Sequence, residues 1–271
     1  MKSAVKRIKG ILSSLMYVAV YYAVSLLVYA VYYIWNITGG RISAAEIEKN
    51  ANNGSFALTV ITSIICLWIY MLIGKIRKKP LSGTVADRSV PSIIYIMAAT
   101  LAIGCRFLVA VYYSASQKVE LLHNSIERAA QSAPDINNAV QMLIALFCVI
   151  VVAPLFEELL FRSLVMGELM KIMRPWAAIT FQAIVFGAAH GVLFQSVFAF
   201  AVGIVLGLVY YRTQSIKTAA VCHGVFNFST VFMVENMSVI GNVIFITAGI
   251  LLSALSLFYI FANTRDCSKM N

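Results

Sequence analysis

Charged residues are scarce in this sequence. They make up only 12% of its 271 residues, whereas 61% are hydrophobic, so the chain lacks the polar surface that a soluble protein of this length presents to water. The charge that is present is unbalanced, with 21 Lys and Arg against 11 Asp and Glu. These basic residues are spread over short connections and do not form one stripe with interleaved aromatic residues, as nucleic-acid binding would require. We therefore expect the lipid bilayer as a partner and no nucleic acid.

Cysteine patterns that would build a thiol site are also missing. Four of the five cysteines lie inside apolar runs, and none stands in a CxxC or another metal-ligand spacing. We expect neither disulfide bonds nor a zinc site with thiolate ligands. The five residues are Cys66, Cys105, Cys148, Cys222 and Cys267.

The chain is rich in long apolar runs, of a length near the roughly 20 residues that a helix needs to cross about 30 Å of hydrocarbon. They predict an all-α fold, a polytopic transmembrane helical bundle of about eight helices. The first run follows several basic residues, is too long for a cleaved signal peptide and is interpreted as a retained signal anchor. The runs are 11–35, 56–74, 90–113, 139–171, 175–190, 194–211, 217–234 and 239–262.

The basic residues predict a topology. They concentrate at the N-terminus and in alternate connections, near 75–88, 171–174, 212–217 and 265–269, which the positive-inside rule places in the cytoplasm. We expect a multi-pass protein of the cell membrane with both termini cytoplasmic. The connections 36–55 and 114–138 are nearly charge-balanced, and the second has apolar residues at helical spacing that predict a short interfacial helix.

Ionisable residues inside three of the apolar runs predict a functional site. A charged side chain at the centre of a bilayer costs about 2.5–3.5 kcal/mol on insertion scales, so it normally faces a protein interior or a wet cavity. Glu157, Glu158 and Arg162 lie in the string PLFEELLFR of the fourth run. His190 ends the fifth run in FGAAH, and the seventh contains HGVFN with His223 and Asn227.

Spacing predicts that these residues meet. The basic residues and Pro175 indicate a turn after the fourth run, and Glu157 and His190 stand about equally far from it, roughly 16 residues on each side. Two antiparallel helices then bring them to the same depth. His223 and Asn227 are four residues apart, hence on one helix face, and close to Lys217. We expect all four around one cavity in the inner leaflet.

These residue types suit hydrolysis of an acyl bond. A buried Glu and His that share a water can activate it, with the carboxylate as general base, while the second His and the Asn amide can donate to an oxyanion. Equally, Glu157, His190, His223 and Asn227 are a plausible ligand set for one divalent metal ion that would acidify the water. Glu158 can neutralise the Arg162 guanidinium four residues on.

Each residue also has a structural explanation. A lone intramembrane His often serves as a hydrogen-bonding residue between helices, and the two glutamates can belong to an interfacial ion pair with the nearby bases. Buried charge is also found in transporters, but no inverted repeat is visible here.

Three motifs carry a family resemblance. EExxxR at 157–162, FxxxH at 186–190 and HxxxN at 223–227 resemble, in order and spacing, the motifs of the CAAX-protease/bacteriocin-processing family (CPBP or Abi) of intramembrane proteases. The resemblance covers about residues 145–230. It implies that Glu157 activates water, that His190 assists it and that His223 and Asn227 stabilise the oxyanion. It implies supporting roles for the residues Glu158, Arg162 and Phe186.

The resemblance also implies an activity. We expect an intramembrane endopeptidase that acts on a membrane-associated peptide or protein, as in CAAX, bacteriocin or signal-peptide processing, with Zn²⁺ or another divalent ion as an open alternative. The rival hypothesis is a non-catalytic membrane scaffold or bacteriocin self-immunity protein of the same fold. The expected division of the chain is 1–138 for generic N-terminal helices, 139–234 for a catalytic core and 235–271 for the last helix and a cytoplasmic tail.

Overall fold

The protein is described here by a computed structural model. It covers residues 2–39, 55–78, 87–131, 133–134, 136–231 and 238–264, with side chains from residue 5 onward. In these ranges the regular structure is helical, apart from one isolated antiparallel bridge between Asp87 and Ser215. The predicted all-α fold class is confirmed.

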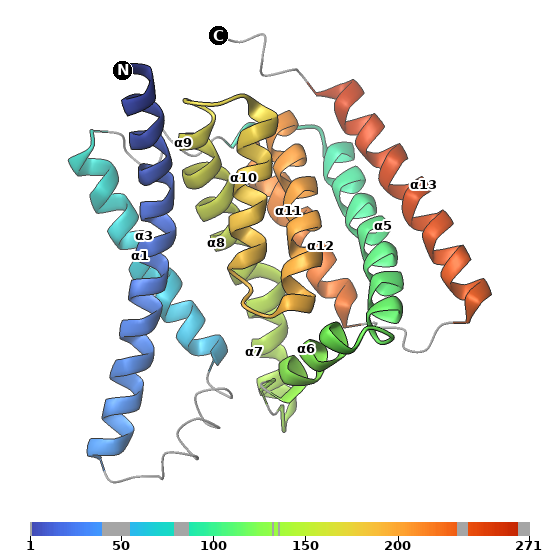
Figure 1. The fold of residues 1–271 in the computed structure, drawn as a ribbon, viewed down its shortest axis with the longest axis horizontal. Helices are drawn as coiled ribbons and strands as arrows, with labels where there is room; N and C mark the ends of the chain where they lie inside the picture. The colour runs from blue at the N-terminus through green and yellow to red at the C-terminus, as the bar shows by residue number, and fades with distance from the viewer. Residues whose placement is uncertain are drawn as a thin grey trace.

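Each predicted apolar run corresponds to helical structure (Figure 1). Among the described residues, six of these segments are long and apolar enough to cross a membrane, and the chain is a multi-pass membrane protein. The shorter ones are α10 and α12, with 14 and 15 residues. The segments are α1 (Lys2–Thr38), α3 (Ser55–Ile76), α5 (Ser92–Ser116), the fourth segment 139–169, α10 (Pro175–Ala188), α11 (Leu193–Thr213), α12 (Ile216–Thr230) and α13 (Val239–Asn263).

The fourth segment is one long helix interrupted by two π-helical stretches. A π-helix widens the backbone by one residue per turn and frequently marks a functional site. Here the two wide stretches flank the short α-helical piece that contains both glutamates. The parts are α7 (Ala139–Phe147), η1 (Cys148–Val152), α8 (Ala153–Glu158), η2 (Leu159–Met166) and α9 (Gly167–Leu169).

The helices α1 and α3 form one side of the bundle, and α5 with α13 form the other (Figure 1). Between them α12 packs against α5, α11, η1 and α8, so the helix that carries His223 is central. The outer helices expose apolar side chains, such as Leu26 on α1, Trp68 on α3 and Phe258 on α13. Such surfaces are stable in a bilayer and not in water.

The short helix expected in the connection 114–138 is present as α6 (Glu120–Gln131) at one end of the bundle (Figure 1). Ser125 on α6 accepts a hydrogen bond from the backbone N–H of Phe194 at 3.0 Å. This bond satisfies one of the N–H groups that the first turn of α11 leaves without a partner.

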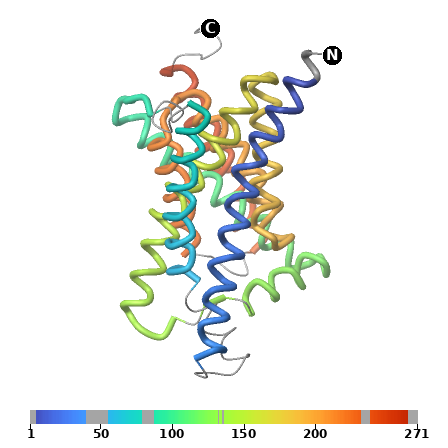
Figure 2. Tube along the Cα trace, turned by 90° about the vertical axis from the view of Figure 1, so that its left-hand side faces the viewer, coloured from blue at the N-terminus to red at the C-terminus, as the bar shows by residue number. Residues whose placement is uncertain are grey.

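The basic connections gather at the opposite end, where α1 begins and α13 ends (Figures 1 and 2). Glu168 pairs with Lys171 at 3.0 Å and with Arg77 at 3.7 Å, and Asp87 pairs with Lys217 at 2.7 Å. The start of α1 and the end of α13 therefore lie on the same side of the bundle, as an even number of membrane crossings requires. The cytoplasmic location of that side and the proposed domain boundaries stay predictions. The residues Lys79, Arg265, Cys267 and Lys269 lie outside the described ranges.

Candidate active site

The first π-helical stretch creates a free carbonyl that fixes Asn227. In η1 the N–H groups reach back five residues, as Ala153 does to the carbonyl of Cys148. The next donor would be Pro154, which has no N–H, so the carbonyl of Val149 lacks its donor within the helix. The Asn227 Nδ2 group donates to this oxygen at 2.9 Å. One of the two amide N–H bonds of Asn227 thus ties α12 to η1.

A glycine allows this close approach. A Cβ atom at position 224 would lie 2.4 Å from the carbonyl oxygen of Ile150, far inside van der Waals contact. Only a residue without a side chain lets α12 touch the η1 backbone here. The Gly224 contact and the Asn227 bond together set where His223, one residue before the glycine, stands.

His223 belongs to a buried charge cluster. Its Nδ1 atom lies 2.9 Å from Glu158 Oε1, and Glu158 Oε2 lies 3.0 Å from Arg162 Nε, an ion pair whose angle falls outside hydrogen-bond geometry. The side chains of Glu158 and Arg162 are both fully buried. Arg162 Nη1 also donates to Gln182 Oε1 at 3.0 Å. The expected pairing of Glu158 with Arg162 is present, and its second function is to hold the imidazole.

Phe186 covers this cluster. The Arg162 guanidinium lies 4.6 Å from the centre of the Phe186 ring, in cation–π geometry. The same ring makes edge-to-face contacts with both imidazoles. Its centre lies 4.9 Å from the centre of the His190 ring and 5.8 Å from that of the His223 ring. Phe186 therefore excludes water from the ion pair and separates the two imidazoles.

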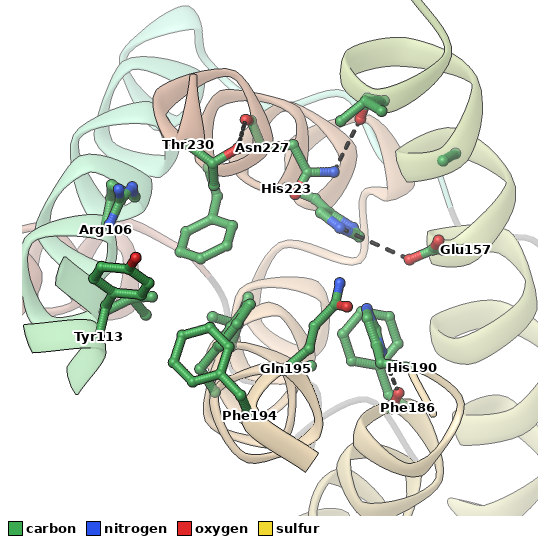
Figure 3. A pocket seen from close by; sticks show the side chains of 17 residues that line it. Arg106, Tyr113, Glu157, Phe186, His190, Phe194, Gln195, His223, Asn227 and Thr230 are labelled. Carbon is green, nitrogen blue, oxygen red and sulfur yellow. Dashed lines mark hydrogen bonds and ion pairs between the residues drawn. The ribbon is translucent and has the colours of Figure 1, made fainter. Parts of the chain in front are cut away.

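The two adjacent glutamates point in different directions. Glu158 is fully buried, whereas the Glu157 side chain is 30% exposed and faces a cavity (Figure 3). Because the carboxylate of Glu158 accepts the Nδ1 proton of His223, the unprotonated Nε2 atom faces Glu157. The separation of His223 Nε2 from Glu157 Oε2 is 3.8 Å, too long for a direct hydrogen bond and suitable for one water between them.

His190 is held in a similar way at the end of α10. Its Nδ1 atom lies 2.8 Å from the carbonyl oxygen of Phe186, which can only accept, so the Nδ1 atom carries the proton and Nε2 has no hydrogen-bond partner among the described residues. The next residue, Gly191, has a positive φ of 69° and turns the chain toward α11. The Tyr22 hydroxyl of α1 donates to the Ala189 carbonyl at 3.1 Å.

The four predicted residues line one cavity of about 410 Å³ (Figure 3). Their expected convergence is therefore observed, whereas their catalytic roles stay predictions. The opposite side of the cavity is formed by α5, and aromatic and small apolar residues form the walls. The lining residues are Arg106, Val109, Tyr113, Val149, Ala153, Glu157, Phe186, His190, Phe194, Gln195, Phe198, Ala199, Val202, His223, Phe226, Asn227 and Thr230.

The cavity extends along the bundle toward the end opposite the basic connections. At 1.5 Å per residue, Gln195 stands about 27 Å along α11 from its basic end at Thr213. Arg106 and Tyr113 likewise lie in the half of α5 farther from the basic end. The sequence places the site near the basic connections by counting from Lys217. Eight of the seventeen lining residues come from the halves of α5 and α11 that lie farther from the basic end. The inner-leaflet location of the site stays a prediction.

The sequence prediction does not include Arg106 and Gln195, two polar residues of the cavity wall. Arg106 is a cation inside the apolar run 90–113, so the same rule that identifies the glutamates applies to it. Gln195 lines the cavity beside His190 and has no motif or charge that would single it out (Figure 3). Only the fold brings both residues to the site.

The metal alternative stays a prediction. Among the described residues, no three His, Cys, Asp or Glu side chains are grouped so that they could hold a metal ion. The Nδ1 atoms of His190 and His223 bond to protein acceptors, so the Nε2 atom of each ring would be the one to hold a metal ion. The Asn227 Nδ2 group bonds to Val149, which leaves the side-chain oxygen of Asn227 as its possible ligand atom. No step below is derived through a metal.

Comparison with known proteins agrees with the three motifs. Residues 139–229, which contain all three, match the family described as type II CAAX prenyl endopeptidase Rce1-like. The protein named "Putative membrane peptidase YdiL" of Bacillus subtilis (strain 168) is 23% identical over 197 residues, which cover 72% of this chain and 78% of that protein. No solved structure matches the chain. The resemblance to the CAAX-protease family is confirmed, and it supports a membrane protease as the kind of function.

Proposed function

We propose that this chain, a member of the CAAX-protease family by its residues 139–229, is an intramembrane endopeptidase that hydrolyses a peptide bond in a membrane-associated peptide or protein. One observation carries the proposal. The Glu157 carboxylate and the free Nε2 atom of His223 face one cavity at a separation of 3.8 Å, which suits a shared water.

Attack begins at this water. Glu157 takes one proton from it as general base while the water oxygen bonds to the carbonyl carbon of the scissile peptide bond. The electron pair of the carbonyl moves to its oxygen, which becomes an oxyanion. His223 Nε2 accepts a hydrogen bond from the second O–H of the water, which keeps this proton, and so orients the attacking lone pair. Glu158 keeps His223 in the tautomer that this task requires.

Donors for the oxyanion are present on two helices. The second N–H of the Asn227 amide is not used by Val149, and the Gln195 amide has no partner among the described residues. Neutral amide donors in a water-poor cavity stabilise a developing negative charge strongly. The resemblance assigns the oxyanion to His223 and Asn227; the bond from His223 to Glu158 favours water orientation for His223 and the oxyanion for the two amides.

Collapse of the intermediate completes the reaction. The proton held by Glu157 passes to the leaving nitrogen, the C–N bond breaks, and a carboxylic acid and an amine are formed. His190, whose Nε2 atom is free, assists proton transfer on the same side of the cavity as Glu157. The requirement for Zn²⁺ or another divalent ion stays a separate prediction, which activity in the presence of a strong chelator would test.

The test compares Glu157→Gln with wild type. Gln keeps the size of the side chain but cannot accept the proton, and losing a general base typically lowers the rate about 100- to 10,000-fold. The matched control is Glu120→Gln, the same change on the exposed face of α6. Peptides in membranes from cells with equal amounts of each protein would be compared by mass spectrometry.

We expect at least one cleavage product that is present with wild type and Glu120→Gln and absent with Glu157→Gln. If no product depends on Glu157 and the variant fully restores any deletion phenotype, the chain acts as a non-catalytic scaffold or self-immunity protein instead. The variant must accumulate and unfold at the wild-type temperature, which separates loss of chemistry from loss of fold.

A further inference from the structure

Arg106 is a buried cation that has no acidic partner in the described part of the chain. It lies in the middle of the membrane-spanning helix α5, with only 6% of its surface exposed. Its Nε group donates to the backbone carbonyl of Ser229 at 3.3 Å. Among the described residues, no carboxylate lies within ion-pair distance of its guanidinium, which lines the cavity across from Glu157 (Figure 3).

Helix capping explains only part of this arrangement. Ser229 is in the last turn of α12, where carbonyl groups lack helical donors and favour a nearby cation. That contact uses one of the five N–H donors of the guanidinium. A neutral donor would satisfy the same carbonyl without placing a full charge inside an apolar bundle. The four donors on Nη1 and Nη2 therefore still need an explanation.

The bundle neutralises its other deeply buried arginine. Arg162 is fully buried, and Glu158 lies 3.0 Å from it on the next helical turn. A buried charge left alone is strongly destabilising, whereas a paired one is tolerated. The contrast indicates that the partner of Arg106 comes from outside the described part of the chain. An arginine fork suits a planar carboxylate, which it binds through two parallel hydrogen bonds.

We propose that Arg106 binds a carboxylate of the substrate, on the side of the cavity away from Glu157. The inference rests on the proposed peptidase function and adds the class of substrate: an apolar peptide with a carboxylate near the scissile bond. That carboxylate is either the free C-terminus or an acidic side chain. Tyr113, seven residues after Arg106 and on the same helix face, offers a hydroxyl at this end of the cavity (Figure 3).

The geometry keeps two negative charges apart. The rings of Phe198 and Phe226, 6.3 Å apart between their centres, line the cavity between α11 and α12. A substrate carboxylate at Arg106 is therefore separated from the carboxylate of Glu157, which would repel it. The apolar wall suits the side chains of a hydrophobic peptide, while Arg106 fixes which end of the peptide lies on α5.

Binding is tested separately from cleavage. The full-length Glu157→Gln protein in nanodiscs would be titrated with four versions of one hydrophobic peptide. They carry a free C-terminal acid, a C-terminal amide, an internal Glu with an amidated end, or an internal Gln with an amidated end. We expect one acidic version to bind about 10- to 100-fold more tightly than its neutral match, as a lost hydrogen bond to a charged group implies.

Arg106→Met should abolish that preference, because it lowers the affinity for the acidic peptide and leaves the affinity for the neutral peptide unchanged. Arg128→Met is the matched control, because Arg128 is an exposed arginine on α6 that donates to Asn124 outside the cavity. Arg106→Lys keeps the charge without the fork, so we expect it to retain part of the preference. If the Met variant fails to accumulate, the Lys variant decides the question. A full wild-type preference for the acidic peptide in Arg106→Lys would show that the arginine fork is not used.

Every outcome is informative. Preference for the free acid identifies the C-terminus, and preference for internal Glu identifies a side chain. Equal binding of all four peptides, unchanged in Arg106→Met, overturns the carboxylate site. Cleavage of the same peptides by protein with Glu157 intact tests the proposed function independently: Arg106-dependent binding without any cleavage would overturn the peptidase and leave the carboxylate site standing.

Discussion

Replacing Gly224 with alanine tests whether the contact between α12 and η1 controls the site. The added Cβ would lie 2.4 Å from the carbonyl oxygen of Ile150, where ordinary contacts begin at 3.4 Å. The new Cβ is fixed to the backbone of α12, and the atom that it meets belongs to the backbone of η1, so no side-chain rotation can relieve the overlap. The two helices must separate by about 1 Å, since a packed interior relieves such overlap only by backbone shifts.

The shift has two consequences of different size. Overpacking of this kind destabilises a protein by about 1–3 kcal/mol. The hydrogen bond from Asn227 to Val149, now 2.9 Å, would lengthen beyond bonding distance, and His223 would move relative to Glu157. A misplacement of about 1 Å at a catalytic group lowers the rate roughly 100-fold. We therefore expect a large loss of cleavage with a modest loss of stability.

The assay measures both quantities in the same preparation. Cleavage of the substrate found by peptide comparison gives the rate, and thermal unfolding in nanodiscs gives the stability. Gly167→Ala is the control, because a Cβ there meets nothing within 4 Å, so alanine should stabilise α9 by about 0.5–1 kcal/mol and leave cleavage unchanged. If Gly224→Ala retained the wild-type rate and unfolding temperature, the contact would not position His223.

Three further predictions follow from the same cluster and its surroundings. Glu158→Gln should destabilise the protein by about 3–5 kcal/mol, because it leaves a buried arginine unpaired, whereas Glu157→Gln should unfold near the wild-type temperature; equal midpoints would refute the difference. Gln195→Met should lower kcat about 100-fold at unchanged stability if its amide contacts the oxyanion, and an unchanged kcat would exclude that role. Partial burial raises the pKa of Asp87, but hydrogen bonds from Lys217 and Ser215 outweigh it and lower the pKa overall. The contact therefore stabilises the folded protein fully above the unfolded-state pKa of about 3.9, and this stabilisation is lost as the pH falls through the lower pKa of the folded state. Hydrogen exchange at residues 215–217 should detect the loss in wild type and not in Asp87→Asn.

The sequence predicts the helices well because a bilayer permits few alternatives. A segment in hydrocarbon must satisfy its own backbone, so apolar runs of sufficient length become helices. The convergence of Glu157 with His190 is predictable for a related reason: a regular helix advances 1.5 Å per residue, and a proline marks the turn between the two helices. Counting then gives relative depth without any knowledge of side-chain packing.

The other features of the site depend on tertiary contacts, which counting residues along helices does not reveal. Nothing in CVIVVAP specifies a π-helix by itself, and the free carbonyl of Val149 exists only because the wide turn meets Pro154. The sequence predicts Asn227 as an oxyanion donor and cannot show that half of its amide is committed to the backbone. Gln195 has no charge to reveal it. Arg106 does carry a signal, since a cation within an apolar run needs a partner.

The charges of the bundle separate into those that the fold satisfies and those that it leaves for a ligand. Glu158, Arg162 and His223 form a closed group in which each charge has a partner within 3.0 Å. Among the residues that the structure describes, Glu157 has a 3.8 Å approach to an imidazole and Arg106 has a backbone carbonyl. Both face the same cavity. Because an isolated charge inside a membrane bundle lowers stability, its retention is expected where it acts on something that enters, and the opposite signs at the two sides would orient a peptide between them.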